Sequence, residues 1–127
     1  KRQRWICFSD EILYLYIATR LTQGETDFDE GVKKIKQEHN IPLICVTMGK
    51  DGSIAYYGDK RVEVKGFYQE NVVDTTGAGD TFCGGLCVGL SEGLSLKEAA
   101  EFATKASAMT VQKLGAQESI PHRSEIK

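Results

Sequence analysis

The chain has 127 residues, with 16 Lys and Arg against 18 Asp and Glu and a formal net charge of −2 at pH 7. Hydrophobic residues make up 41% and charged residues 27% of the sequence, which is typical of one globular domain and excludes a disordered or fibrous protein. The near-neutral charge argues against nucleic acid as the main partner. We also expect no membrane partner and no signal peptide, because no window reaches the roughly 18 apolar residues of a membrane helix and the basic start lacks a sufficient apolar run.

The four cysteines give a weak indication of the compartment. They include no Cys-x-x-Cys pair, although Cys83 and Cys87 would share one face of a helix. Neither of the two histidines lies at metal-ligand spacing from them. We therefore expect buried free thiols ahead of zinc binding or a disulfide, and a reducing cytoplasmic location.

The first third of the chain is expected to contain two helices followed by a strand. Residues 10–21, rich in Leu, Ile and Tyr, are predicted to form the first helix. A second helix begins after a cap at Thr26 or Asp27, shows apolar residues at helical spacing, and ends at residues 39–42. The unbroken apolar run over residues 43–46 predicts a strand covered on both faces, as in a parallel α/β sheet.

A hairpin and two further helices are expected next. A glycine-punctuated turn over residues 47–52 leads into strands predicted at residues 53–57 and 61–65. Residues 74–80 then open a helix that runs to about Leu90. A sheet of about three strands is thin for a complete α/β layer fold, so this order of elements predicts part of such a fold.

The last helix carries the clearest local signals. Ser95 and Glu98 have the spacing of a capping box, and Gly115 is the predicted C-cap. One face of this helix is formed by small residues at helical spacing, namely Ala99, Ala103, Ala106 and Thr110.

The chemistry is expected where a short strand runs into Gly77, Ala78 and Gly79 at the start of a helix. The first turn of a helix leaves backbone N–H groups unpaired, and small residues let an anion approach them closely. Asp80 lies in this turn, either as an acid that stabilises the helix start or as a base aimed at a reacting group. A bound phosphate beside a base would suit phosphoryl transfer to a hydroxyl.

Two better-known anion motifs do not fit this loop. In a Walker A motif a lysine follows the second glycine, but the interval from Gly79 to Gly84 is followed by Gly85. The dinucleotide fingerprint needs a third glycine at the position of Phe82. The loop therefore represents another kind of anion site.

Residues 74–82, read as DTTGAGDTF and followed by Gly84, Gly85 and Leu86, resemble the C-terminal signature of the ribokinase family, the PfkB-type carbohydrate kinases that include fructokinases and ribokinases. Residues 46–52 resemble the family's nucleotide-loop glycine motif, and residues 114–121 its closing segment. The resemblance implies a ribokinase-like three-layer α/β/α fold. Residues 1–127 would be its C-terminal ATP-binding and catalytic-base portion, without the N-terminal half and its lid.

The resemblance also implies residue roles. Asp80 would be the catalytic base, and the anion hole would be formed by Gly77, Ala78, Gly79 and the Asp80 amide. ATP would contact residues of two loops and one helix, namely Thr47, Gly49, Gly52, Gly79 and Thr104, the last beside adenine.

Two kinds of metal ion are implied as well. A monovalent cation, usually potassium, would bind oxygen atoms of Asp74, Thr76, Thr110, Lys113, Gly115 and Ser119. Mg²⁺ would arrive with ATP, held mainly by phosphates and water. The family's Asn-x-x-Glu pattern near magnesium has only a weak counterpart at residues 9–12, with Ser9 for Asn and Ile12 for Glu.

The implied activity is ATP-dependent phosphorylation of a small sugar hydroxyl. A fructose-like ketose is favoured because residues 72–80 occur widely in that branch, and ribose comes next. The alternatives are a kinase of a sugar acid, nucleoside or vitamin alcohol, and a non-catalytic nucleotide-binding fragment. Alone, the 127 residues are expected to be inactive and to expose a sheet edge that favours a homodimer.

Overall fold

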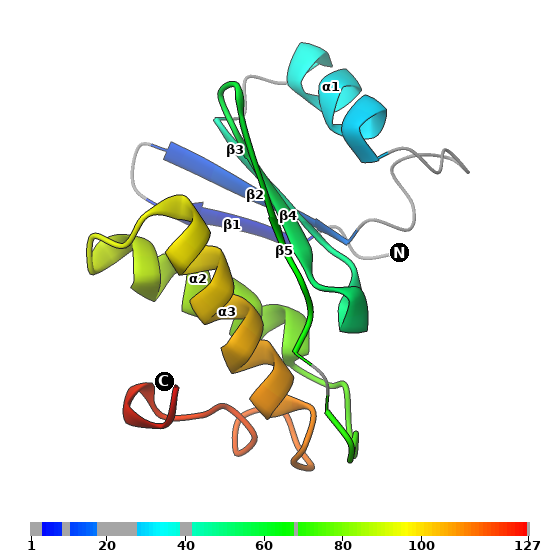
Figure 1. Cartoon of the computed structure of the whole chain (residues 1–127), viewed down its shortest axis with the longest axis vertical. Coiled ribbons are helices and arrows are strands. Elements are labelled where there is room, and N and C mark those ends of the chain that lie inside the picture. The colour runs from blue at the N-terminus through cyan, green and yellow to red at the C-terminus, as the bar shows by residue number, and fades with distance from the viewer. Residues whose placement is uncertain (1–3, 9–10, 18–27, 39–41, 68, 127) are drawn as a thin grey trace. The chain divides into compact units, whose positions relative to one another are not determined.

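The structure, a computed structural model, describes residues 4–8, 11–17, 28–38, 42–67 and 69–126. It divides into two compact units (Figure 1). One unit is made of Lys1–Met48 and Ile54–Val62, and the other of Gly49–Ser53 and Glu63–Lys127.

A five-stranded sheet has its strands in chain order, β1-β2-β3-β4-β5. They are β1 (Arg4–Phe8), β2 (Glu11–Ile17), β3 (Leu43–Thr47), β4 (Ser53–Tyr57) and β5 (Lys60–Val64). Strand β1 pairs antiparallel with β2, and β2 pairs parallel with β3, with Leu13 opposite Leu43. The parallel pair is connected through helix α1 (Phe28–Glu38), as parallel pairing requires a crossover.

The helix predicted over residues 10–21 is wrong, because Glu11–Ile17 forms β2. Its sequence EILYLYI is rich in β-branched and aromatic residues, which favour strands. The periodicity of a short apolar run does not separate a buried strand from a buried helix. The sheet consequently has five strands, where about three were expected.

The other predicted elements of this unit are confirmed. Helix α1 ends at Glu38, just before residues 39–42, and the strand expected at residues 43–46 is β3, whose first four residues are buried. The expected cap at Thr26 or Asp27 lies outside the described residues. The core of the unit joins α1, β3 and β4 through Val32, Ile35, Ile44, Val46, Ile54 and Tyr56.

Helices α2 (Ala78–Ser91) and α3 (Leu96–Thr110) pack against each other in the second unit, as Figure 1 shows. The capping box of α3 is confirmed, since the Glu98 amide donates to the Ser95 hydroxyl at 3.2 Å and the Ser95 amide donates to the Glu98 carboxylate at 2.9 Å. The small-residue face predicted for this helix is buried throughout.

The two helices approach closely because glycines of α2 face alanines of α3. A Cβ atom at Gly85 would lie 3.0 Å from the Cα of Ala103, and one at Gly89 would lie 3.0 Å from the Cα of Ala99. Gly84, one residue away, has open space instead. The close approach brings the side chains of α3 within hydrogen-bonding reach of the backbone of α2.

The prediction of Gly115 as the C-cap of the last helix is wrong. Helix α3 ends at Thr110, with Val111 as its C-cap. Its last carbonyl groups find partners without a glycine: those of Met109 and Thr110 accept from Gln112 and Lys113 at 3.3 Å each. The helix therefore closes in a tight turn, and Gly115, with φ of 99°, lies in the loop beyond it.

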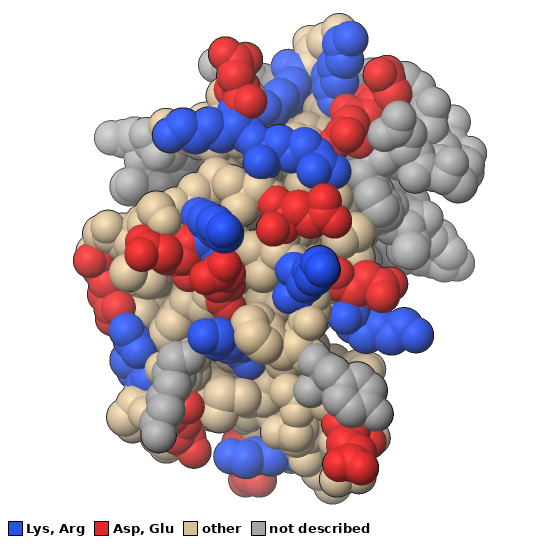
Figure 2. Space-filling view, in the orientation of Figure 1, with Lys and Arg blue, Asp and Glu red and all other residues tan. Residues whose placement is uncertain are grey.

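Three of the cysteines are free thiols, as expected. Cys45 and Cys83 are buried and Cys87 is half-buried, where burial raises the pKa of its thiol. Within the described part of the chain, no helix has both the length and the apolar character needed to span a membrane. On the face shown in Figure 2, acidic and basic side chains are interspersed.

Candidate functional site

The candidate site begins at Gly77, the N-cap of α2. Its backbone has φ of 82° and ψ of −4°, in the left-handed region that favours glycine. A Cβ atom here would also lie 3.1 Å from the carbonyl oxygen of Ala116. The same residue provides no side-chain hydrogen bond to the first turn of the helix, so the turn starts without the cap that most helices have.

The residues after Gly77 present backbone donors at an open surface. Ala78 and Gly79 lie in the first turn, and a Cβ atom at Gly79 would meet nothing within 4 Å. The Ala78 amide makes a long bond of 3.3 Å to the carbonyl of Thr75. Asp80 is exposed in the same turn, so a carboxylate stands beside amides that carry the positive end of the helix dipole.

Hydroxyl groups of α2 and α3 hydrogen-bond to the carbonyl groups of this turn. The Ser107 hydroxyl, on α3, donates to the Ala78 carbonyl at 3.0 Å. The Thr81 hydroxyl donates to the Gly77 carbonyl at 2.9 Å and lies 3.0 Å from the buried Thr110 hydroxyl of α3. The first two carbonyl groups of the loop are therefore held by side chains.

Asp74 joins the loop before α2 to the loop after α3. One oxygen of its carboxylate accepts from the Thr76 amide at 2.9 Å, and the other accepts from the Gly115 amide at 3.3 Å. The Thr76 hydroxyl and amide, together with the Gly115 amide, hold the pKa of Asp74 below its ordinary value of 3.8. The carbonyl of Val111 completes the junction by accepting from the amides of Val73 at 2.8 Å and Asp74 at 3.2 Å.

The glycine-rich turn predicted to contact nucleotide is a short 3-10 helix, Gly49–Asp51, followed by Gly52 with φ of 103°. A Cβ atom at Gly52 would lie 2.0 Å from the carbonyl oxygen of Val64, and one at Gly66 would lie 1.9 Å from that of Lys50. Both glycines are therefore required by close contact between two backbone segments.

Thr104 is buried and already hydrogen-bonded. Its hydroxyl donates to the Ala100 carbonyl at 2.7 Å and lies 3.4 Å from the hydroxyl of Ser53, the first residue of β4. Thr104 thus lies beside the residue that directly follows the predicted nucleotide turn. Thr47, also predicted to contact ATP, is the last residue of β3 and belongs to the other unit.

Three of the six predicted cation ligands form one network, namely Asp74, Thr76 and Gly115. The hydroxyl of Thr110 lies 3.0 Å from that of Thr81 and 3.1 Å from the Ala106 carbonyl, and the Thr110 carbonyl oxygen accepts from the Lys113 amide at 3.3 Å. Ser119 is buried and donates to the Ala116 carbonyl at 3.3 Å, while Lys113 is exposed. Among the described residues, no group of three or more His, Cys, Asp or Glu is arranged to hold a metal ion.

The pattern at residues 9–12 that resembled a magnesium-side motif gains no support. Ser9 and Asp10 lie outside the described residues, and Ile12 is part of strand β2.

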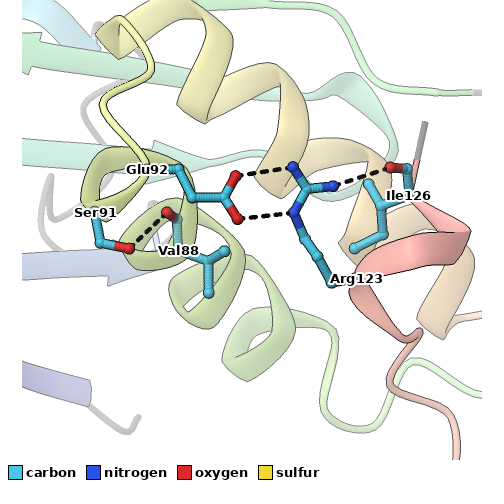
Figure 3. A network of polar contacts seen from close by, with 5 residues as sticks. All are labelled: Val88, Ser91, Glu92, Arg123 and Ile126. Carbon is cyan, nitrogen blue, oxygen red and sulfur yellow. Dashed lines mark hydrogen bonds and ion pairs between the residues drawn. The ribbon is translucent and has the colours of Figure 1, made fainter.

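The sequence also holds the Gly-x-Ser-x-Gly spacing of a nucleophile elbow at residues 89–93, but the structure explains it as a helix end. An elbow needs a strand-to-helix turn, whereas Ser91 closes α2 and donates to the Val88 carbonyl at 2.8 Å (Figure 3). Gly93, with φ of 83°, and Leu94 donate to the carbonyls of Leu90 and Gly89 at 3.1 Å each. This is a Schellman cap.

The same end of α2 is bound to the C-terminal segment. Arg123 donates from Nε to Glu92 at 3.0 Å and from a terminal nitrogen at 2.8 Å (Figure 3). Its guanidinium lies 4.5 Å from the ring centre of Phe102, and it lowers the pKa of Glu92. These contacts hold the C-terminal segment on α2 and α3, at the end of α2 opposite Gly77.

Sequence reasoning missed the supporting hydroxyls of Ser53, Thr81 and Ser107. Thr81 directly follows Asp80, and Ser107 lies three residues before Thr110, but their spacing carries no signal by itself. The Ser107 contact depends on how α2 and α3 pack, and the Ser53 contact on how the start of β4 meets α3, whereas Thr81 bonds the Gly77 carbonyl at the start of its own helix. The small-residue face of α3 was a hint that a backbone comes close to that helix.

Comparison with known proteins gives consistent matches. A model of the pfkB family carbohydrate kinases matches residues 15–123. A ribokinase of Lactococcus lactis is 40% identical over 97 residues, covering 76% of this chain and 32% of the relative, and a fructokinase of Escherichia coli is 33% identical over 114 residues, covering 85% and 37%. The chain thus spans about a third of the length of these relatives.

Solved structures agree with this match. A ribokinase of Thermotoga maritima is 30% identical with a TM-score of 0.78, over 90% of this chain and 40% of that one. A ribokinase of Arabidopsis thaliana, solved with ribose and ATP, is 30% identical with a TM-score of 0.80, over 90% and 39%.

Proposed function

Because this chain belongs to the pfkB family of carbohydrate kinases, we propose that residues 1–127 form the C-terminal, ATP-binding and catalytic-base portion of an ATP-dependent sugar kinase. The observation that carries the proposal is the start of α2, where Gly77 leaves the first turn without a side-chain cap and Asp80 is exposed beside it. An uncapped helix start offers its amides to an anion.

The proposed chemistry uses these groups directly. The backbone amides of Gly77, Ala78, Gly79 and Asp80 would bind the transferring phosphoryl group. The Asp80 carboxylate would accept the proton of the sugar hydroxyl. As it does so, the oxygen of that hydroxyl would bond to the γ-phosphorus of ATP, and the bond from this phosphorus to the leaving oxygen of ADP would break. The amides stabilise charge that develops on the phosphoryl oxygens without reorganising during the reaction.

ATP is proposed to lie along the glycine-rich turn, with Thr47, Gly49 and Gly52 near its phosphates and ribose. Thr104 is proposed to stand beside adenine as a packing residue, because its hydroxyl is already donated to Ala100. The Arabidopsis thaliana ribokinase, solved with ribose and ATP, supports the choice of nucleotide. Mg²⁺ would accompany ATP and be held mainly by phosphate and water oxygens.

A monovalent cation, in practice potassium, is proposed next to the anion loop. Its ligands would be oxygens of Asp74, Thr76, Thr110, Lys113, Gly115 and Ser119. The fit rests on the ionised Asp74 carboxylate, whose pKa is lowered by its Thr76 and Gly115 contacts, and on the two loops that it joins. Thr110 would contribute an oxygen atom at the end of α3.

The acceptor is proposed to be a small sugar. Fructose is the first candidate because of the motif over residues 72–80, and ribose is the second, supported by the 40% identical ribokinase. The 127 residues alone are expected to turn over no sugar, because the relatives they match are about three times as long. The cytoplasmic location and the homodimer stay predictions.

The test is the substitution Asp80→Asn in the protein encoded by the complete reading frame. We expect turnover of the preferred sugar, chosen from a panel that includes fructose and ribose, to fall about a hundredfold or more, while ATP affinity stays within about twofold because the amides remain. Asp59→Asn, at an exposed hairpin position, is the control and should match the unsubstituted protein. Turnover that survives in Asp80→Asn would remove Asp80 from the role of base.

A further inference from the structure

The carbonyl groups at the start of α2 are held by hydroxyls that no part of the proposed chemistry uses. Ser107 donates to the Ala78 carbonyl at 3.0 Å, and Thr81 donates to the Gly77 carbonyl at 2.9 Å while lying 3.0 Å from Thr110. Thr81 and Thr110 are 5% and 0% exposed, so water does not compete for this pair.

A peptide unit is planar, so a bond that fixes its carbonyl also fixes the direction of its N–H. The Ala78 carbonyl shares its plane with the Gly79 amide, and the Gly77 carbonyl shares its plane with the Ala78 amide. The Gly79 amide therefore points away from the Ser107 hydroxyl, whereas the Ala78 amide is directed at the Thr75 carbonyl at 3.3 Å. Ser107 thus acts on the direction of the Gly79 amide.

We propose that Ser107 of α3 is a positioning residue that aims the Gly79 amide, one of the backbone amides of the anion loop, at the phosphoryl group. This rests on the proposed function, in which those amides bind that group. Donors stabilise a developing charge only when they are already oriented toward it, and glycine at positions 77 and 79 leaves the backbone free to turn unless something holds it. The Gly77 carbonyl also accepts from the Thr81 amide at 2.9 Å, and the Ser107 hydroxyl adds a restraint on the next carbonyl, that of Ala78.

Ser107 gives the cleaner experiment, because its bond reaches the Ala78 carbonyl directly. Ser107→Ala removes the hydroxyl, and Ser107→Thr keeps one. Ser91→Ala is the matched control, because it removes a bond of the same kind, from a serine hydroxyl to a carbonyl of α2 at 2.8 Å, at the other end of that helix. The protein tested is the one encoded by the complete reading frame.

The first readout is the direction of the Gly79 N–H bond, measured by residual dipolar couplings in nitrogen-15-labelled protein. We expect it to change in Ser107→Ala, to return in Ser107→Thr and to stay unchanged in Ser91→Ala. An unchanged direction in Ser107→Ala would overturn the proposal, whether or not the protein phosphorylates a sugar.

The second readout is turnover of the sugar with ATP, at a temperature where all variants are folded. We expect kcat to fall about tenfold in Ser107→Ala, less than the loss of a whole donor, with KM for ATP within about twofold and recovery in Ser107→Thr. Loss of stability alone would leave kcat per folded molecule unchanged, and that result would overturn the proposal. Absence of turnover in the unsubstituted protein would count against the proposed function instead, and the couplings would still decide the role of Ser107.

Discussion

The two helices of the second unit differ in how the backbone N–H groups of their first turns are capped. Each begins with backbone N–H groups that have no partner within the helix. Helix α3 satisfies them with its own side chains, through the reciprocal bonds of Ser95 and Glu98. Helix α2 begins at Gly77, which provides no side-chain cap. Helix α3 meets this requirement with its own side chains and α2 does not, and for this reason we propose the start of α2 as the functional one.

The surroundings of α2 strengthen the contrast. Its opposite end is fully closed by the Schellman cap at Gly93 and by the contacts of Arg123 with Glu92. Its first two carbonyls accept from two hydroxyls, that of Thr81 in α2 itself and that of Ser107 on α3. The Ala78 amide makes a long bond to the Thr75 carbonyl, and we propose that the amides of this first turn bind an anion.

The largest effect is expected when α2 is given a cap. In Gly77→Asn the new residue tolerates the left-handed backbone, and its Cβ atom, 3.1 Å from the carbonyl oxygen of Ala116, requires that loop to shift by a few tenths of an ångström. Its side-chain oxygen would occupy first-turn amides that the proposal reserves for phosphate. Turnover should fall about a hundredfold, as when an oxyanion donor is lost. Gly58→Asn is the control, since Gly58 has φ of 57° and open space around it, and its sugar kinetics should not change. Undiminished turnover in Gly77→Asn would break the comparison between the two helices.

A smaller effect, on stability only, is expected when α3 loses its cap. Ser95→Ala removes the acceptor of the Glu98 amide, and such a loss costs about 1 kcal/mol of unfolding free energy. Urea unfolding of Ser95→Ala should therefore show a lower midpoint, while kcat and KM stay as in the unsubstituted protein. A reduced kcat in this variant would mean that the start of α3 also serves the reaction.

How much of the structure could be predicted from the sequence depends on whether each element is determined by residues that are neighbours in the chain. Three elements were predictable because a few neighbouring residues determine them. They are the capping box at Ser95, the helix over Ala78–Ser91, and the strand Leu43–Thr47, whose first four residues are buried. Strand β2 was mistaken for a helix, because an apolar run takes its conformation from the strands that pair with it. Gly115 was misread as a cap, since its positive φ serves the loop that reaches Asp74.

The same distinction, between local signals and contacts set by packing, applies to the candidate site. The proposed anion loop at Gly77 could be suggested from the sequence because glycine spacing and a helix start lie together in the chain. The contact of Ser107 could not, because its partner is set by the packing of α2 on α3. The role of the Thr104 hydroxyl was likewise hidden until Ala100 and Ser53 were seen beside it.

The smallest effect is a pH dependence confined to the capped helix. The backbone and side chain of Ser95 lower the pKa of Glu98 from its ordinary value of 4.5, so this carboxylate adds stability that is present above its unfolded pKa and lost as pH falls through the lower folded pKa. Glu98→Gln keeps an acceptor for the Ser95 amide but cannot titrate. The unfolding free energies of the two proteins in urea should therefore converge between about pH 6 and about pH 3. Glu70→Gln, at an exposed position outside both helices, is the control and should not show this convergence. A difference for Glu98→Gln that stays constant over this range would mean that the cap of α3 acts through hydrogen bonds without its charge.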